Sequence, residues 1–373
     1  MAARSARGLL AIVVFLVVYG SLYPFEFVRT PNYGGFLSLE PGQSGVADFV
    51  LNLFLYAPVG FLIFHSLEAG GRGRRIAVAC IAGTLMSAAV EMAQGFDLMR
   101  DSSLSDIVSN GLGSLAGAML AAALPAFSLK RKVALRPALL CMFWALFQLY
   151  PLLPQLSGAA LAHSAAGFHQ WSWFEALLFA VDWFTAFALL SEALPLSRRG
   201  SAAWLVLLMP VKLILFERGL RASEVAGALA ALALFVLLRR ARLETRAFAA
   251  ILIVVLIARE LAPFRFGPPS GFGWLPFGAS LFQQTVSAVV VLLRKAFVYG
   301  SAVWFLSQTA MRIRSATMSV AVLLLPLEWV QRWIPGRTPE ITDSVLALVM
   351  GAVLALLTSS TAWDSQSNEP KAT

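Results

Sequence analysis

Long apolar runs follow one another along most of the chain, with polar residues gathered in short stretches between them. Each run is about 18–24 residues long, which is enough for a helix to cross a bilayer. The runs do not alternate apolar and polar residues at every second position, as the strands of a membrane barrel would. The pattern therefore predicts an all-α polytopic transmembrane bundle. The twelve expected spans are 8–24, 47–67, 75–97, 104–126, 135–153, 172–193, 201–217, 222–238, 247–262, 285–308, 312–333 and 342–360.

Composition excludes several other classes of protein. Of the 373 residues 59% are hydrophobic and only 13% are charged, whereas about 25% of the residues of a soluble domain are charged. Cys80 and Cys141 are the only cysteines, so neither a disulfide framework nor a cysteine-based metal site is available. His163 and His169 share one loop without an acidic cluster beside them. We expect no metal, no cofactor and no nucleic-acid partner, and the chain has no nucleotide-binding motif.

Basic residues are concentrated in every second loop. One set of loops carries 18 lysines and arginines and the opposite set carries 8. Basic residues in short loops mark the cytoplasmic side of a membrane. No good small-residue cleavage site follows the first apolar run, so we expect an uncleaved first span. These observations predict a multi-pass protein of a bacterial inner membrane with both termini in the cytoplasm, and they assign the net charge of +9 to the cytoplasmic loops.

Four polar residues recur at identical spacings in the first and last thirds of the chain. Glu91 is followed by a glutamine, an arginine and an aspartate three, nine and fifteen residues later, and the same residues follow Glu328 at the same distances. The first set is Glu91, Gln94, Arg100 and Asp106. The second set is Glu328, Gln331, Arg337 and Asp343. In addition, Asn52 and Tyr56 match Lys295 and Tyr299 in spacing.

The middle third shows a weaker trace of the same pattern. Lys212 stands at the position of the glutamate, and Arg221 follows nine residues later. Each unit holds four spans, an even number, so the units are expected to be parallel repeats. The expected organisation is a first repeat over 1–128, a degenerate middle repeat over 129–245, a third repeat over 246–362 and a cytoplasmic tail over 363–373.

Two motifs carry a resemblance to a known family. They read Glu91-x-x-Gln94, Arg100, Ser105-Asp106 and Asn110-x-x-Gly113 in one segment, and Asp48, Asn52 and Tyr56-x-Pro58-x-Gly60 in the other. The chain resembles the VanZ-like family, a set of four-span membrane domains named after an accessory protein of glycopeptide-antibiotic resistance. The first third matches the whole pattern. The last third departs from it at Lys295 and at Ala347, which replaces Asn110.

The recurring polar residues are the candidate binding site. Charged groups within a span are costly and usually face the bundle interior, and an arginine can grip an anion with two parallel hydrogen bonds. A phosphate, a carboxylate or a sugar would each suit the cluster. The competing interpretation is an ion pair that braces the hairpin, with Ser103 and Asp106 forming a capping box. The candidates are Glu91, Arg100, Asp106, Asp48, Asn52, Gln94 and Asn110, together with Glu328, Gln331, Arg337 and Asp343.

Three functions stay open at this point. The first is an envelope protein that acts at the outer leaflet on a lipid-linked or anionic envelope group, with membrane lipids as its other partners. The second is an enzyme on a lipid-linked substrate, and the third is a transporter of a small amphiphile. Arg294 and Lys295 lie inside an apolar run and need partners, for which Glu328 and Asp343 are candidates. We expect the working site in the first repeat, because only this repeat keeps every polar element.

Overall fold

The computed structural model is helical throughout the part of the chain that it describes, apart from isolated β-bridges. It describes residues 3–33, 46–100, 102–124, 134–150, 171–194, 220–237, 245–278 and 286–366, with short pieces at 158, 162, 167–169, 200, 208–213 and 215. This confirms the predicted all-α class. The longer helices are α1 (Ala3–Leu22), α2 (Val46–Ser66), α3 (Arg72–Gln94), α4 (Leu104–Ala123), α5 (Leu135–Leu149), α7 (Trp173–Ala193), α10 (Ala222–Leu237), α11 (Thr245–Leu261), α13 (Val286–Ser307), α14 (Ile313–Val330) and α15 (Thr342–Gln366).

Six of these helices are long and apolar enough to cross a membrane. They lie at Ala3–Leu22, Phe49–Ser66, Arg72–Gln94, Trp173–Ala193, Ala288–Ser307 and Ile313–Trp333. Three shorter apolar helices lie at Leu135–Leu149, Ala222–Leu237 and Thr342–Leu357. The protein is therefore a helical membrane protein. Of the span expected at 201–217, only α9 (Leu208–Leu213) and Leu215 fall in the described residues.

The chain divides into two compact units. The first comprises Met1–Lys130 and Leu356–Thr373, and the second comprises Arg131–Ala355. The second unit thus holds most of what the sequence divides into a middle and a third repeat. The three-repeat organisation remains a prediction.

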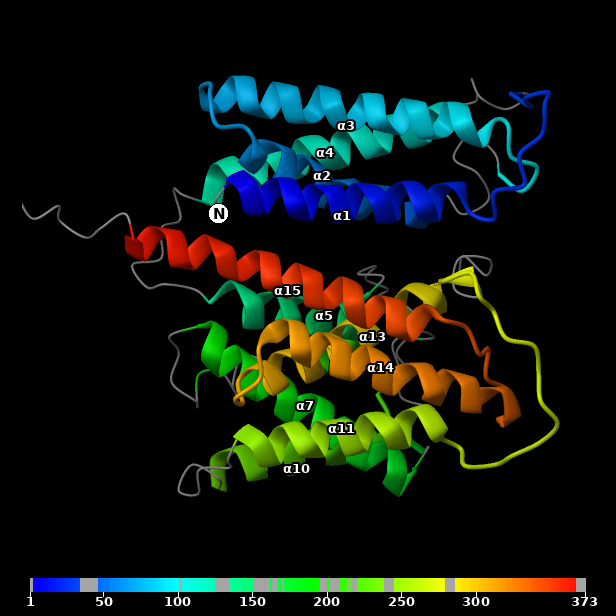
Figure 1. Cartoon of the computed structure of the whole chain (residues 1–373), viewed down its shortest axis with the longest axis vertical. Coiled ribbons are helices and arrows are strands. Elements are labelled where there is room, and N and C mark those ends of the chain that lie inside the picture. The colour runs from blue at the N-terminus through cyan, green and yellow to red at the C-terminus, as the bar shows by residue number, and fades with distance from the viewer. Residues whose placement is uncertain are drawn as a thin grey trace, which may run out of the picture. The chain divides into compact units, whose positions relative to one another are not determined.

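In the first unit, α1 to α4 lie side by side as an up-and-down bundle (Figure 1). Helices α2 and α4 make the closest approach, and glycines permit it. A Cβ on Gly113 would overlap the Leu53 carbonyl, and a Cβ on Gly117 would overlap the Ala57 carbonyl. Small residues in a helix interface bring backbones together in this way in membranes. The approach of α2 to α4 brings the polar residues at the starts of these two helices close to one another.

In the second unit, α7 packs on α10, and α5 packs on both α7 and α13. The core between α5 and α7 contains Trp144 and Trp183, both fully buried, with ring centroids 4.8 Å apart. Helix α13 also packs against α11 and α14. The segments expected to form two repeats therefore share one core, and Figure 1 shows their helices running side by side.

Candidate functional site

The candidate residues of the first unit gather where α1 and α3 end and α2 and α4 begin, which we call the first polar end. The segment after α1 pairs there with the segment after α3. The Val28 amide donates to the Phe96 carbonyl at 2.7 Å, and the Leu98 amide donates to the Glu26 carbonyl at 3.2 Å. This pairing fixes the loop that carries Arg100.

Arg100 braces the end of α1. Its Nε donates to the Tyr23 carbonyl at 2.8 Å and its Nη2 donates to the Gly20 carbonyl at 2.9 Å. Carbonyls in the last turn of a helix lack partners within the helix, and a cation there also suits the helix dipole. Burial lowers the pKa of the Arg100 guanidinium, but an arginine stays protonated at physiological pH. Two of the nitrogens that the sequence analysis assigned to an anion are thus occupied by backbone.

Glu91 caps the start of α4. Its buried carboxylate accepts a hydrogen bond from the Ser103 amide at 2.8 Å through Oε2. Ser103 is the N-cap residue of α4, and its hydroxyl accepts from the Ser105 amide at 3.2 Å. In the predicted capping box, the Asp106 side chain would accept a hydrogen bond from the Ser103 backbone amide. That amide donates to Glu91 instead, and Asp106 bonds Asn52 on α2. This part of the predicted capping box is therefore wrong.

Asp106 and Asn110 form the interior of the first polar end. The side-chain Nδ2 of Asn52 donates to Asp106 Oδ1 at 2.9 Å. The side-chain Nδ2 of Asn110 donates to the Ser87 hydroxyl at 2.9 Å. Asn110 Oδ1 is buried and lacks a hydrogen-bond partner in the described part of the chain. Buried polar atoms are normally paired, so this atom indicates a place for a polar occupant.

Two further candidates complete this end. Gln94 donates through Nε2 to the Ser21 carbonyl at 2.8 Å, which adds a second contact to the last turn of α1. Asp48 lies in the first turn of α2, but its side chain falls outside the described residues. The structure thus brings Asn52, Asp106 and Asn110 together in the interior of the first polar end. Gln94 belongs with Glu91 and Arg100 to what we call the frame, the side chains that bond the backbone of the helix ends.

The second polar end, where α11 and α14 end and α13 and α15 begin, repeats this frame. Arg337 Nε donates to the Ala262 carbonyl at 3.2 Å, and its Nη2 donates to the Arg259 and Ala262 carbonyls at 2.5 and 2.9 Å. Arg259 lies in the last turn of α11 and Ala262 directly follows that helix, as Gly20 and Tyr23 do for α1. The Gly267 amide donates to the Trp333 carbonyl at 2.7 Å, which matches the bond from Val28 to Phe96.

Glu328 caps α15 with both carboxylate oxygens. Oε1 accepts from the Asp343 amide at 2.6 Å, and Oε2 accepts from the Ser344 hydroxyl at 3.0 Å. Asp343 itself pairs with Lys295, with Nζ and Oδ1 2.5 Å apart. Of the two acids that the sequence offered to Lys295, Asp343 is the one in direct contact. Arg294 faces a different acid, Asp182, at 3.9 Å.

Glu260 is a buried acid that the sequence analysis missed. The Tyr299 hydroxyl donates to its Oε1 at 2.9 Å and the Gln331 amide donates to its Oε2 at 2.8 Å. Glu260 is 3% exposed. The signal available in the sequence was an acid within an apolar run, directly after Arg259, which by itself indicated only a polar helix end.

The middle segment uses its polar residues differently. Lys212 is buried and donates to Gln148 Oε1 at 2.9 Å and to Glu224 Oε1 at 2.5 Å. Arg221 pairs with Glu175 at 2.7 Å, and both side chains are more than a third exposed. Arg221, which stands in the middle segment at the position of Arg100, therefore bonds an acid of α7 rather than the carbonyls of a helix end.

The described residues contain no group of three histidine, cysteine or acidic side chains that could hold a metal ion. Long apolar helices with buried polar clusters at their ends define a polytopic helical membrane protein. Within that class, residues 8–126 match the VanZ/LLP1 family model. This confirms the resemblance that the sequence motifs indicated for the first third of the chain, and the similarity to this family is shown for those residues alone. No curated protein and no solved structure matches the chain.

Proposed function

We propose that this VanZ-like membrane protein acts in the cell envelope and that its first polar end binds the head group of a lipid-linked envelope precursor. The observation that carries the proposal is the unsatisfied buried atom Asn110 Oδ1, beside the contact between Asn52 and Asp106. A bound polar group would supply the missing hydrogen bond, and leaving such an atom unpaired is costly.

The charges at this end favour a ligand that donates hydrogen bonds. Glu91, Asp97 and Asp106 are acids, whereas Arg100 directs two of its nitrogens to backbone carbonyls. Carboxylate and amide oxygens accept hydrogen bonds, and like charge repels a bare phosphate. The sequence left a phosphate, a carboxylate and a sugar open as the ligand. We favour the sugar, because its hydroxyl or amine groups can donate hydrogen bonds to these oxygens.

The repeated frame supports a second part of the proposal, that the segments 1–128 and 246–362 are copies of one four-helix unit. Arg100 and Arg337 brace the last turn of the first helix in each copy. In the later copy, Glu260, Tyr299 and Lys295 bond to one another or to neighbouring side chains. The working site then belongs to the earlier copy.

The orientation of the protein is part of the proposal, because the head group of an exported precursor faces the outside. A cysteine-free variant with either Thr30→Cys or Gly73→Cys tests it, since both positions are exposed. In intact cells, an impermeant thiol reagent should label position 30 and not position 73. The reverse pattern would contradict an extracytoplasmic first polar end.

Binding can be tested on purified full-length protein with two matched probes, a polyprenyl phosphate and the same lipid carrying a pyrophosphate-linked sugar. We expect the sugar-bearing lipid to bind more tightly. The double variant Ser87→Ala with Asn110→Ala removes both partners of one hydrogen bond, so its effect on folding should be small. It also removes Asn110 Oδ1 from the site.

Loss of the preference for the sugar-bearing lipid in this double variant, with a normal unfolding temperature, would support the proposal. The single variant Ser87→Ala is the control, since it keeps the amide. Equal binding of the two lipids by the unmodified protein would contradict the sugar assignment. In cells, a deletion strain should change in its lipid-carrier profile or its glycopeptide susceptibility, and the double variant should fail to restore it.

A further inference from the structure

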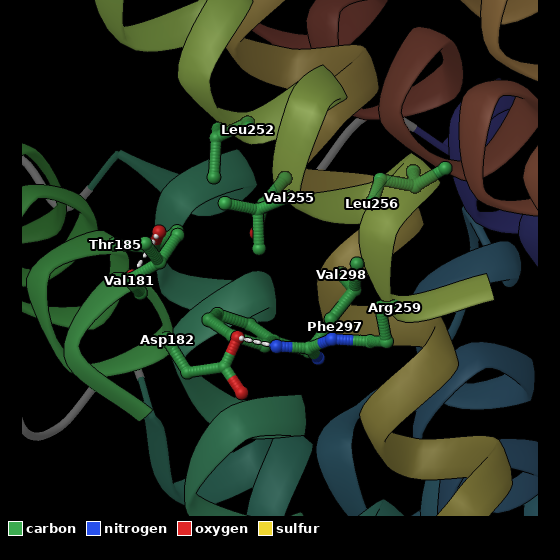
Figure 2. A pocket seen from close by; sticks show the side chains of 10 residues that line it. Val181, Asp182, Thr185, Leu252, Val255, Leu256, Arg259, Phe297 and Val298 are labelled. Carbon is green, nitrogen blue, oxygen red and sulfur yellow. Dashed lines mark hydrogen bonds and ion pairs between the residues drawn. The ribbon is translucent and has the colours of Figure 1, made fainter. Parts of the chain in front are cut away.

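A pocket inside the second unit is too small for a ligand larger than water. Asp182 and Arg259 lie at its edge, and Figure 2 shows the two side chains bonded to each other. Arg259 Nη2 lies 2.9 Å from Asp182 Oδ1, and the free space beside the pair is about the size of one water molecule. A larger ligand of this unit would need a site elsewhere, and the surface offers one.

Aromatic side chains gather at the surface of the second unit where α14 ends. Residues 262–278, drawn in yellow in Figure 1, run past this end. The ring centroid of Phe272 lies 4.9 Å from that of Trp274 and 5.3 Å from that of Trp329. Trp274 is 69% exposed and Trp329 is 42% exposed. Exposed apolar groups gathered in this way mark a surface that contacts a membrane or a partner.

Arg332 lies against these rings with part of its guanidinium unused. Its Cζ lies 4.5 Å from the Trp329 ring centroid and 5.5 Å from the Trp333 ring centroid. Its Nε donates to the Ser270 carbonyl at 2.9 Å, whereas its two Nη atoms bond none of the residues that the structure describes. A guanidinium held in place in this way can grip a phosphate with parallel hydrogen bonds. We call the following residues the aromatic-arginine cluster: Phe272, Trp274, Trp329, Arg332 and Trp333.

The cluster lies at the level where a bilayer has its head groups. The candidate span that includes α14 runs from Ile313 to Trp333, so Trp329, Arg332 and Trp333 stand at its end. Tryptophans are enriched at the membrane–water interface, and an arginine near the end of a span reaches toward the head groups. Because this level follows from the length of the span, it holds for either orientation of the protein.

One exposed charge is reversed between the segment after α1 and the segment after α11. Residues 23–33 and 262–272 share the sequence Pro-Phe-x-Phe near their start, and both end in an aromatic residue. The variable position is Glu26 in the first segment and Arg265 in the second, and both residues are exposed. No acidic residue lies in 262–278, so Arg265 adds a positive charge to the segment that carries the cluster.

The position of Arg332 also differs between the two ends. Gly95 stands there at the first polar end, and a Cβ added to Gly95 would lie 2.1 Å from the Tyr33 ring. The first end therefore has no room for an arginine at this position. The acids nearest to Arg332 along the chain, Glu328 and Glu340, are 1% and 9% exposed. The exposed charge beside the cluster is therefore positive.

We propose that the aromatic-arginine cluster binds the phosphate of an anionic phospholipid at the membrane surface. The Nη atoms of Arg332 donate to the phosphate oxygens, and Arg265 adds attraction for a negatively charged head group. A choline head group is disfavoured, because the Arg332 cation already lies against the Trp329 and Trp333 rings. This site is separate from the proposed head-group site of the first polar end, so either proposal can fail without the other.

The test uses full-length protein purified in detergent and titrated with short-chain lipids that have the same acyl chains. Dioctanoyl phosphatidylglycerol should raise the unfolding temperature in a saturable manner, with a midpoint about tenfold lower than that of dioctanoyl phosphatidylcholine. Inorganic phosphate at the same concentrations should have little effect. No saturable response, or equal midpoints for the two lipids, would overturn the proposal. An equal effect of inorganic phosphate would show a site for a soluble anion and would overturn it too.

Variants locate the lipid at the cluster. Arg332→Gln should weaken the midpoint for phosphatidylglycerol about tenfold and Arg265→Gln about fivefold, with little change for phosphatidylcholine. Arg29→Gln is the matched control, because it removes an exposed arginine from the segment after α1, and it should keep the preference for phosphatidylglycerol. All three variants should keep the preference for the sugar-bearing lipid, which separates this site from the first polar end.

Arg265→Gln keeps the test decisive if Arg332→Gln fails to fold, since Arg265 is exposed and bonds no described side chain. An unchanged preference for phosphatidylglycerol in Arg265→Gln, and in Arg332→Gln where it folds, would overturn the proposal. An equal loss in Arg29→Gln would also overturn it, because the lipid would then respond to net charge rather than to the cluster.

Discussion

The two polar ends have the same frame and different interiors. In each, an arginine braces the last turn of the first helix, a glutamate caps the fourth helix and a glutamine contacts the first helix. Inside the frame, Asn52 faces Asp106 at the first end, whereas Lys295 faces Asp343 at the second. The first interior keeps the unsatisfied atom Asn110 Oδ1, and the second pairs its acids with neighbouring side chains.

This difference separates residues that hold the fold from residues to which we assign the proposed binding. Arg100 and Glu91 were candidates for ligand contact, but both bond backbone atoms of a helix end. Arg337 and Glu328 make the same backbone contacts at the second end, where the acids of the interior are already paired. Recurrence therefore marks the frame. Ala347 and Lys295 stand in the later segment where Asn110 and Asn52 stand in the first, so we assign the proposed binding to the positions that differ.

The largest expected effect is the loss of either bracing arginine. Arg100→Ala and Arg337→Ala should each lower the free energy of unfolding by about 2–4 kcal/mol, because carbonyls at a helix end lose charged donors. Lysine at either position should keep only part of this stability, because its donors sit on a single nitrogen and lack the rigid planar fork of a guanidinium. Thermal unfolding in detergent and the level of protein in the membrane measure the effect. Normal abundance with lost activity in Arg100→Ala alone would instead place Arg100 in the binding site.

One substitution can give the first interior the lysine that the second interior has. Asn52→Lys should pair with Asp106 as Lys295 pairs with Asp343, and so close the first interior. We expect at least a tenfold weaker binding of the sugar-bearing lipid, about 1.4 kcal/mol, with little change in protein level. Titration of the lipid and immunoblotting of membranes provide the two measurements. Full binding in this variant would show that the space between Asn52 and Asp106 is not used.

The two capping glutamates differ in the number of their bonds. Glu328 accepts two hydrogen bonds from α15 and its first turn, and Glu91 accepts one from Ser103. Glu328→Ala should therefore destabilise the protein by about 1 kcal/mol more than Glu91→Ala does. Chemical or thermal unfolding of both variants side by side decides this. A larger loss in Glu91→Ala would mean that Glu91 makes contacts beyond the helix cap.

The smallest effect is expected at the middle arginine. The pair of Arg221 and Glu175 is exposed, and exposed ion pairs contribute about 0–1 kcal/mol. Arg221→Gln should therefore change the unfolding temperature only slightly and leave lipid binding intact. Comparing the unfolding temperatures of Arg221→Gln and Arg100→Ala distinguishes an exposed arginine from one that braces a helix end. An unfolding temperature lowered as much as in Arg337→Ala would contradict it.

Much of the frame was predictable, and most of the partners were not. The spacing of Glu91, Arg100 and Asp106 indicated a polar cluster at one end of the bundle, and all three residues do lie at that end, each bonded to a different partner. The spacing could not show that Arg100 bonds the carbonyls of α1, because every helix end offers such carbonyls. Nor could it separate a capping box within α4 from a cap supplied by Glu91 on α3.

The sequence by itself determined the class of the protein, the positions of most helices and the VanZ-like character of the first third, because apolar run length and motif spacing are local properties. The tertiary structure decided which charges pair. Asp182 lies far along the chain from Arg259 and Arg294 and carries no local signal; the packing of α11 against both α7 and α13 brings the three together. Inside a membrane, where a charge cannot turn to water, that packing determines what each polar residue can bind.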